Sequence, residues 1–186
     1  MQGMGLCWPM SPKPITYVMF LRGINVGGHR KVPMADLRAL IARVTGDAAA
    51  RTYIASGNAV FVSADERAEL TARLGQAIEQ QFGFTVPVML ISMAELQEVL
   101  AGCPWPDVPG NQVHAFFCFS RPSVDSARIK SLATQGEAVE VKGNTVWMHT
   151  PGGLGKSQLA ARIDFGAEST ARNLNTLRAC ANMAKP

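Results

Sequence analysis

The sequence lacks the residue groupings that mark metal-binding and disulfide-stabilised proteins. Its few cysteines and histidines are spread along the whole chain: Cys7, Cys103, Cys118 and Cys180, and His29, His114 and His149. Without a Cys-x-x-Cys pair or a histidine spacing typical of metal ligands, neither a zinc site nor a disulfide scaffold is indicated. We therefore expect reduced thiols in a cytoplasmic protein, with no metal and no cofactor.

Long hydrophobic runs and a strong charge of either sign are also missing. No stretch approaches the roughly 20 apolar residues of a membrane-spanning helix, so no membrane partner is expected. The net charge is only +4, which fits an anionic ligand but is too small to diagnose nucleic-acid binding. Residues 1–14 have neither the basic nor the apolar segment of a signal peptide, so we expect a flexible tail before a fold that begins near Ile15.

Three glycines, in contrast, occur together with basic residues in one stretch, LRGINVGGHRKVP, from Leu21 to Pro33. Glycines and an asparagine give this stretch backbone freedom, while Arg22, Arg30 and Lys31 give it positive charge. Amides of a glycine-rich loop at the start of a helix can point together at one anion. We predict an anion-binding loop, and its predicted ligand-binding residues are Arg22, Gly23, Asn25, Gly27, Gly28 and Lys31. The alternative is a structural crossover whose glycines satisfy tight backbone geometry and whose charges are incidental.

Hydrophobic periodicity predicts a β-α-β-β-α-β order in the first half of the chain. The predicted elements are a strand over 15–21, a helix over 33–44, strands over 51–56 and 59–62, a helix that ends at 83, and a strand over 84–91. Gly57-Asn58 joins the two central strands as a hairpin. Capping boxes at Ser63/Glu66 and Ser92/Glu95 open the second helix and a third, short helix. This order is that of the ferredoxin-like fold.

A stretch rich in glycine and proline, Gly102 to Gly110, separates this half from a second one with a similar pattern. The predicted elements there are strands over 113–119, 137–141 and 145–149, a short helix over 123–132, and helical structure from about 170. The central hairpins of both halves contain Gly-Asn, YIASGNAVFV against VEVKGNTVWM. We therefore predict an α+β protein of two tandem ferredoxin-like subdomains, 15–101 and 112–186, with a linker at 102–111 and a second subdomain modified at its C-terminus.

Several motifs together resemble one protein family. They are LRGINVGGHRKVPMADLRAL, YIASGNAVF, FGFTVPV, HTPGGLGKSQL and TARNLNTLRAC, which span nearly everything from Ile15 to Ala181. In order and spacing they are similar to the domain of unknown function 1697 (DUF1697). The resemblance implies an α+β fold of two ferredoxin-like subdomains, usually standing alone in bacterial cytosolic proteins, and it implies no assigned activity. Leu174 stands where the family has tryptophan.

The segment Gly152 to Ser157 is similar to a phosphate-binding loop. Thr150 stands where the full pattern requires glycine, so nucleotide hydrolysis is not indicated. Lys156 and Ser157 at the start of a helix are instead predicted to help bind an anion.

A polar cluster marks the helix predicted from Thr170. Arg172, Asn175 and Thr176 would form a compact cluster near the positive end of that helix, with Asn173 on its flank. Such guanidinium and amide groups suit a planar or phosphorylated ligand, and we predict that they bind it. The alternative is a solvated helix face.

These features support three hypotheses about function. In the first, a small cytosolic protein binds a phosphate-bearing or other anionic ligand; if it is an enzyme, charge stabilisation by arginine and lysine is the mechanism with visible residues. In the second, it is a nucleic-acid-associated module, whose affinity would fall steeply with salt. In the third, it is a dimeric protein-interaction domain.

Overall fold

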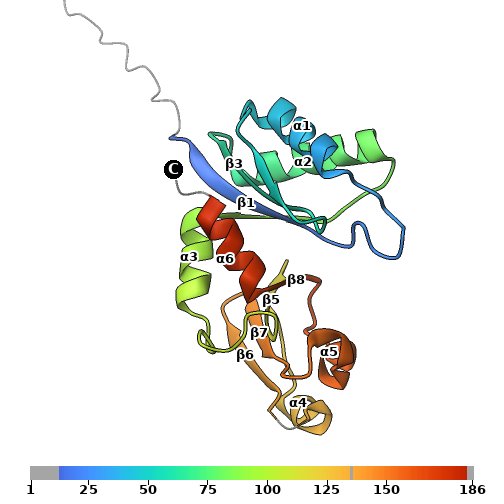
Figure 1. Ribbon diagram of the computed structural model, residues 1–186, viewed down its shortest axis with the longest axis vertical. Coiled ribbons are helices and arrows are strands. Elements are labelled where there is room, and N and C mark those ends of the chain that lie inside the picture. Colours follow the sequence, from blue (N-terminus) through green and yellow to red (C-terminus); the bar gives the residue numbers. More distant parts are fainter. Residues whose placement is uncertain (1–12, 135, 184–186) are drawn as a thin grey trace, which may run out of the picture.

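In the computed structural model, which describes residues 13–134 and 136–183, the chain forms two four-stranded antiparallel sheets flanked by helices (Figure 1). We call the sheet with strand order β2-β3-β1-β4 sheet A and the sheet with order β6-β7-β5-β8 sheet B. The tail predicted at 1–14 falls outside the described residues, except for residues 13 and 14. No helix in the described ranges is long and apolar enough to cross a membrane.

The first half of the chain contributes sheet A and three helices. Its elements are β1 (Ile15–Leu21), α1 (Met34–Thr45), β2 (Arg51–Tyr53), β3 (Asn58–Ser63), α2 (Arg67–Phe82), β4 (Val88–Ser92) and α3 (Met93–Ala101). The predicted element order is present, and β1 has its predicted bounds. One predicted cap is wrong: Glu66 rather than Ser63 caps α2, because the Glu66 carboxylate accepts a hydrogen bond from the Ala68 amide at 2.7 Å. The Ser92/Glu95 capping box of α3 is confirmed.

The second half contributes sheet B, and its end differs from the prediction. Its elements are β5 (Val113–Cys118), α4 (Ser126–Leu132), β6 (Ala138–Lys142), β7 (Thr145–His149), the 3₁₀ turn η1 (Leu154–Lys156), α5 (Gln158–Arg162), β8 (Ser169–Asn173) and α6 (Leu174–Met183). The helix predicted from Thr170 is wrong in its first turn, because these residues form strand β8 beside β5. Every second residue of β8 is buried, so burial and pairing with β5 select a strand where the local sequence does not.

The two halves repeat one arrangement of strands and helices. The two sheets have the same strand order when β1 to β4 are matched with β5 to β8. Each last strand leads directly into a helix, since Ser92 ends β4 and caps α3, and Asn173 ends β8 with its side chain accepting from the Thr176 amide of α6 at 2.9 Å. Helix α6 is therefore the counterpart of α3.

Hydrogen bonds at the ends of β1 and β5 match the two halves residue by residue. The Leu21 amide donates to the Gly57 oxygen at 2.9 Å, and the Cys118 amide donates to the Asn144 oxygen at 2.9 Å. Leu21 therefore corresponds to Cys118, and Gly57 corresponds to Asn144. The Gly-Asn pairs of the two hairpins, which the sequence comparison aligned, are displaced from each other by one residue.

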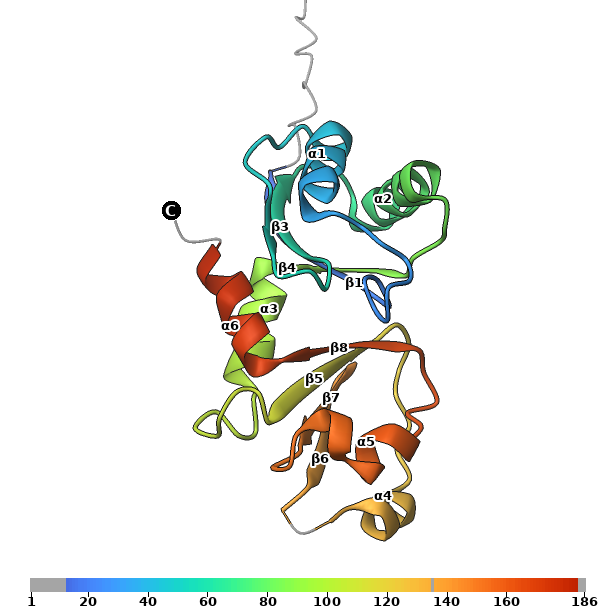
Figure 2. The ribbon, with the colours of Figure 1, turned by 45° about the vertical axis from the view of Figure 1, so that its right-hand side comes forward.

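Three hydrophobic clusters connect the layers. One lies between sheet A and helices α1 and α2, a second lies between sheet B and helices α4 and α5, and a third is shared by the two halves. In the shared cluster the rings of Phe20 and Phe117 have centroids 5.0 Å apart. Figure 2 shows α3 and α6 side by side, on the face of sheet A opposite α1 and α2. Sheet A is thus covered on both faces, which explains why the part of β1 from Tyr17 to Leu21 is buried without interruption.

Candidate functional site

The glycine-rich loop between β1 and α1 contains a narrow turn that projects from the end of sheet A (Figure 1). Gly27 and Gly28 are its central residues, with φ angles of 59° and 80°. The His29 amide closes the turn by donating to the Val26 oxygen at 3.0 Å. Positive φ at both central positions is typical of a type I′ turn, which glycine adopts without steric cost. The geometry of the turn therefore accounts for these two glycines.

Asn25 fastens the loop to the neighbouring hairpin. Its side-chain oxygen accepts from the Val32 amide at 2.8 Å. Its side-chain nitrogen donates to the Val32 oxygen at 3.0 Å and to the Ala55 oxygen at 2.7 Å. The residue has a φ of 55°, a left-handed conformation that asparagine tolerates better than most residues. In this structure Asn25 therefore holds the loop rather than facing an open site.

A hollow of about 460 Å³ lies at the base of the loop. Its lining residues are Arg22, Gly23, Arg30, Thr85, Pro87 and Glu168. Three segments meet there: the loop itself, the residues before β4 and the residue before β8. Gly23 has a φ of 70°, and a Cβ atom at this position would lie 3.7 Å from Nη1 of Arg30. The Arg30 guanidinium therefore lies close over the Gly23 backbone.

Two guanidinium groups and one carboxylate determine the charge of this hollow. Arg22 forms an ion pair with Glu168, and the two side chains are 44% and 53% exposed. Arg30 forms no ion pair with any residue in the described ranges. Two cations and one anion leave an excess of positive charge. The ion pair holds Glu168 only weakly, because exposed pairs contribute about 0–1 kcal/mol.

Arg172 lies beside this region but joins the two halves of the molecule. It projects from β8 into the interface between the sheets and is 8% exposed. Its N–H groups donate to the side chains of Asn58 and Thr170 and to the carbonyl oxygens of Leu21, Ser56 and Ala171. A guanidinium has five N–H groups, so each one has a protein acceptor. Binding a ligand through Arg172 would require breaking at least one of these bonds.

The Arg172 charge is held by neutral groups. Its acceptors are amide, hydroxyl and carbonyl oxygens, and its guanidinium carbon lies 5.2 Å from the centroid of the Phe20 ring, within cation–π range. Burial lowers the pKa of Arg172 to about 10. The side chain is therefore protonated at neutral pH.

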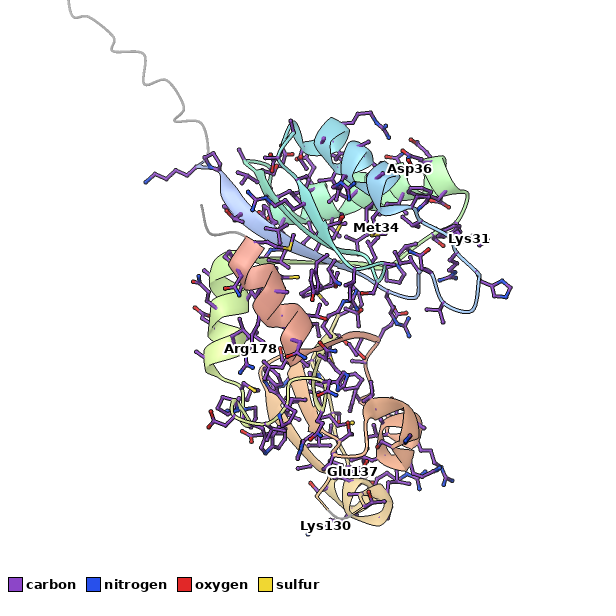
Figure 3. The ribbon with its side chains drawn as sticks, in the orientation of Figure 1. Lys31, Met34, Asp36, Lys130, Glu137 and Arg178 are labelled. Carbon is purple, nitrogen blue, oxygen red and sulfur yellow. The ribbon has the colours of Figure 1, made fainter. Side chains whose placement is uncertain are left out.

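Lys156 and Ser157 lie in the second half, away from the loop. The Ser157 hydroxyl accepts from the Ala160 amide at 2.9 Å and caps α5. Burial alone would raise the pKa of the Glu137 carboxyl. Hydrogen bonds from Ser157 and Thr134 have a larger opposite effect together, so the pKa lies below its usual value. Figure 3 shows Glu137 and Lys31 in different halves of the molecule. No hydrogen bond or ion pair between residues of the described ranges joins Lys156 or Ser157 to the loop.

Asn173 and Asn175 lie at the junction of β8 and α6. Asn173 caps the helix. Asn175 is exposed but packs on Gly110, where a Cβ atom would lie 2.2 Å from the Asn175 side-chain oxygen. Because Arg172 belongs to a strand, the predicted polar wall on one helix face does not form.

The structure thus separates the predicted residues into groups. Arg22 and Gly23 line the hollow, while Gly27, Gly28 and Lys31 lie on the exposed outer loop. Sequence reasoning did not identify Thr85 or Glu168 as part of this region. Glu168 is 146 residues from Arg22, and only the unpredicted strand β8 brings it there.

The described part of the chain contains no cluster of side chains that could hold a metal ion. No three histidine, cysteine or acidic side chains in these ranges are close enough together to hold a metal ion. The cysteines at 103, 118 and 180 are buried and unpaired with one another, and burial raises the pKa of each thiol.

Comparisons with known proteins agree with the resemblance seen in the motifs. No curated protein matches this chain. Among solved structures, it is similar to the conserved bacterial protein SP0830 from Streptococcus pneumoniae, with 26% sequence identity and a TM-score of 0.73 over 93% of this chain and 100% of that chain. Residues 15–147 match the family described as "Protein of unknown function (DUF1697)". This match covers more than half of the sequence, and the chain belongs to the DUF1697 family.

Proposed function

We propose that this protein binds a small phosphate- or carboxylate-bearing ligand in the hollow between Arg22 and Arg30. The observation that carries the proposal is the convergence of two guanidinium groups on a hollow of about 460 Å³. Guanidinium groups bind phosphate and carboxylate through paired, charge-assisted hydrogen bonds. The volume lies within the range of small-molecule sites.

In this proposal the ligand replaces Glu168 on Arg22. The Glu168 carboxylate is a neutralising partner for Arg22 when no ligand is bound, and its half-exposed ion pair is weak enough to exchange. Arg30 supplies a second cation, and the absence of a side chain at Gly23 leaves room beside it. The hydroxyl of Thr85, which lines the same hollow, is a further donor.

The architecture and setting belong to the same proposal. The strand orders of sheets A and B support two ferredoxin-like subdomains, 15–101 and 112–186, joined at 102–111. Buried, unpaired cysteines support a reducing, cytoplasmic setting. The residues of the hollow provide binding and charge stabilisation, and any catalysis would use the latter.

The test is a ligand screen followed by titration of variants. Inorganic phosphate, pyrophosphate, nucleotides, sugar phosphates and organic acids are screened by thermal shift, where a ligand at 100 times its Kd adds about 2.7 kcal/mol of stability. For any hit, calorimetric titration should show at least tenfold weaker binding to Arg22→Ala and Arg30→Ala, and tighter binding to Glu168→Gln. Lys156→Ala, which changes a cation outside the hollow, should bind as the wild type does.

Two outcomes oppose the proposal. If no compound in the panel stabilises the wild type, or if every hit binds Arg22→Ala and Lys156→Ala equally, the hollow is not the site. A linear and steep fall of log affinity with log salt would favour the nucleic-acid hypothesis instead. Sedimentation velocity on the same samples tests the dimer hypothesis.

A further inference from the structure

The internal repeat gives Arg172 a counterpart in the first half. Arg172 is the residue before Asn173, which ends β8 and caps α6; Ile91 is the residue before Ser92, which ends β4 and caps α3. Both side chains lie in the interface between the sheets, Arg172 at 8% and Ile91 at 9% exposure. The same structural position therefore holds a long cation in one half and a shorter aliphatic side chain in the other.

The surroundings of the two positions also correspond. Arg172 meets the Phe20 ring, the Leu21 carbonyl oxygen and the Asn58 side chain. The counterparts of these three residues are Phe117, Cys118 and Thr145, because Phe20 pairs with Asn58 and Phe117 pairs with Thr145. An aromatic face, a strand-end carbonyl and a polar side chain are thus present at both positions.

At the Ile91 position these counterparts line an open cavity. The cavity has a volume of about 460 Å³ and lies between β4, α3 and the β6–β7 hairpin. Its lining includes Ile91 itself and the counterparts of the Arg172 surroundings, which are Phe117, Cys118 and Thr145. Where the Arg172 side chain fills the interface in one half, Ile91 leaves space in the other.

The cavity also contains a carbonyl group without its usual partner. In a hydrogen-bonded pair of an antiparallel sheet, the two opposite residues exchange two bonds, each amide donating to the other residue's carbonyl oxygen. The Cys118 amide donates to the Asn144 oxygen, but no return bond from the Asn144 amide to the Cys118 oxygen is formed within the described chain. The Leu21 oxygen, its counterpart, likewise has no return bond and accepts from Nη2 of Arg172 at 2.6 Å. Cys118 lines the cavity, and no side chain of the described residues donates to its carbonyl oxygen as Arg172 does to that of Leu21.

One carboxylate at the cavity rim has no ion-pair partner among the described residues. Arg67 donates to both carboxylate oxygens of Glu95, at 2.9 and 2.5 Å. The Nζ atom of Lys142 lies 3.2 Å from Oε1 of Glu140. Both basic groups that line the cavity are therefore paired. Glu98 also lines the cavity and forms no ion pair with the described residues.

We propose that this cavity binds a small molecule that carries a guanidinium group, in the orientation that Arg172 adopts at the corresponding position. The guanidinium donates to the Cys118 carbonyl and the Thr145 hydroxyl and lies over the Phe117 ring. Glu98 supplies the compensating charge, and the alkyl part of the ligand packs on Ile91.

The experiment uses agmatine as the probe, with N-carbamoylputrescine, in which an uncharged ureido group replaces the guanidinium, as the comparison. Calorimetric or NMR titration of the full chain should show saturable agmatine binding and at least tenfold weaker binding of N-carbamoylputrescine. Ile91→Arg should abolish agmatine binding, because the introduced side chain occupies the cavity. Thr145→Val and Glu98→Gln should each weaken binding by about fivefold, as expected for the loss of one hydrogen bond or one exposed charge.

Two controls locate the effect. Glu79→Gln changes another exposed helical glutamate, and Arg22→Ala changes the separate hollow; both should bind agmatine as the wild type does. The proposal is overturned if the wild type does not bind agmatine, if N-carbamoylputrescine binds equally well, or if folded Ile91→Arg retains the wild-type affinity. If Ile91→Arg does not fold, Thr145→Val decides, and an unchanged affinity in that variant overturns the proposal.

Discussion

The two halves of this protein share a strand order but complete their common interface differently. In one half Arg172 reaches across to Leu21, Ser56 and Asn58, and its remaining N–H groups donate within its own half. In the other half Ile91 ends short of a cavity lined by Phe117 and Thr145. At the same position of the repeated architecture, one half thus has a side chain that joins the halves and the other half has an open cavity. Four substitutions or pairs of substitutions test this contrast.

The largest expected effect is that of Arg172→Ala. Removing the guanidinium leaves acceptors from both halves without donors and opens a space in the interface, so we expect a loss of about 3–5 kcal/mol in the free energy of unfolding. Urea unfolding measures it. Arg178→Ala is the matched control, since Arg178 is exposed and makes one bond, to the Pro106 oxygen at 2.7 Å, and should cost less than about 0.5 kcal/mol.

Millimolar agmatine should restore part of the lost stability in Arg172→Ala, because the variant resembles the open site. An Arg172→Ala protein as stable as the control variant would show that the two halves do not depend on this residue.

The next effect is a difference in the stability lost when two corresponding aromatic residues are truncated to alanine. Phe20 is 0% and Phe117 4% exposed, and truncation of a buried phenylalanine to alanine costs about 3–5 kcal/mol. Phe117 already borders a cavity, so Phe117→Ala should cost about 1–2 kcal/mol less than Phe20→Ala. Equal losses in chemical denaturation would argue that the cavity is closed in solution.

A smaller effect is expected at the two corresponding helix caps. Ser92→Ala and Asn173→Ala should each lower the free energy of unfolding by about 1 kcal/mol, because each removes the side-chain acceptor of a helix amide. Ser131→Ala, in an exposed position on α4, is the control. A loss confined to one of the two caps would show that α3 and α6 do not carry equal roles.

The smallest effect concerns pH, and it compares His114 with its counterpart Tyr17. The Tyr17 hydroxyl donates to the backbone carbonyl oxygen of Asp65 at 3.3 Å, whereas Nδ1 of His114 has no hydrogen-bond partner within the described chain. Burial lowers the pKa of His114. The unfolded chain therefore takes up a proton at higher pH than the folded chain does, and stability falls as the pH drops below about 6.5.

His114→Phe cannot titrate and should flatten this part of the stability profile, measured by urea unfolding between pH 8 and pH 5. A profile with the wild-type slope would assign the acid sensitivity to other groups.

Local patterns predicted the elements whose cause is local. β1 was predicted with its bounds because both of its faces are buried and a proline and a glycine flank it. The strand predicted over 51–56 ends instead at Tyr53, since Ile54 has a φ of 49°, which is outside the extended region. Nothing in the local sequence STARN distinguishes a strand from a helix start, and β8 depends on its pairing with β5.

The candidate site was only partly accessible to the same reasoning. The glycine-rich loop drew attention to Arg22 and Gly23, which line the hollow. Pairing of Arg22 with Glu168 and of Arg172 with Leu21 joins residues more than a hundred positions apart, and no spacing rule reaches that far. The correspondence between Ile91 and Arg172 follows from the registers of the two sheets, because the Gly-Asn motifs alone align the halves one residue out of step.

The bonds made by Arg172 have a consequence for how the chain matures on the ribosome. Its acceptors in Leu21 and Ser56 precede it by 151 and 116 residues, and at ordinary elongation rates this separation corresponds to a delay on the order of ten seconds. During that delay the face of sheet A opposite α1 and α2 has neither the Arg172 side chain nor helix α6. The nascent chain therefore holds an unfinished apolar surface until α6 has been synthesised, because that helix is the one that covers it.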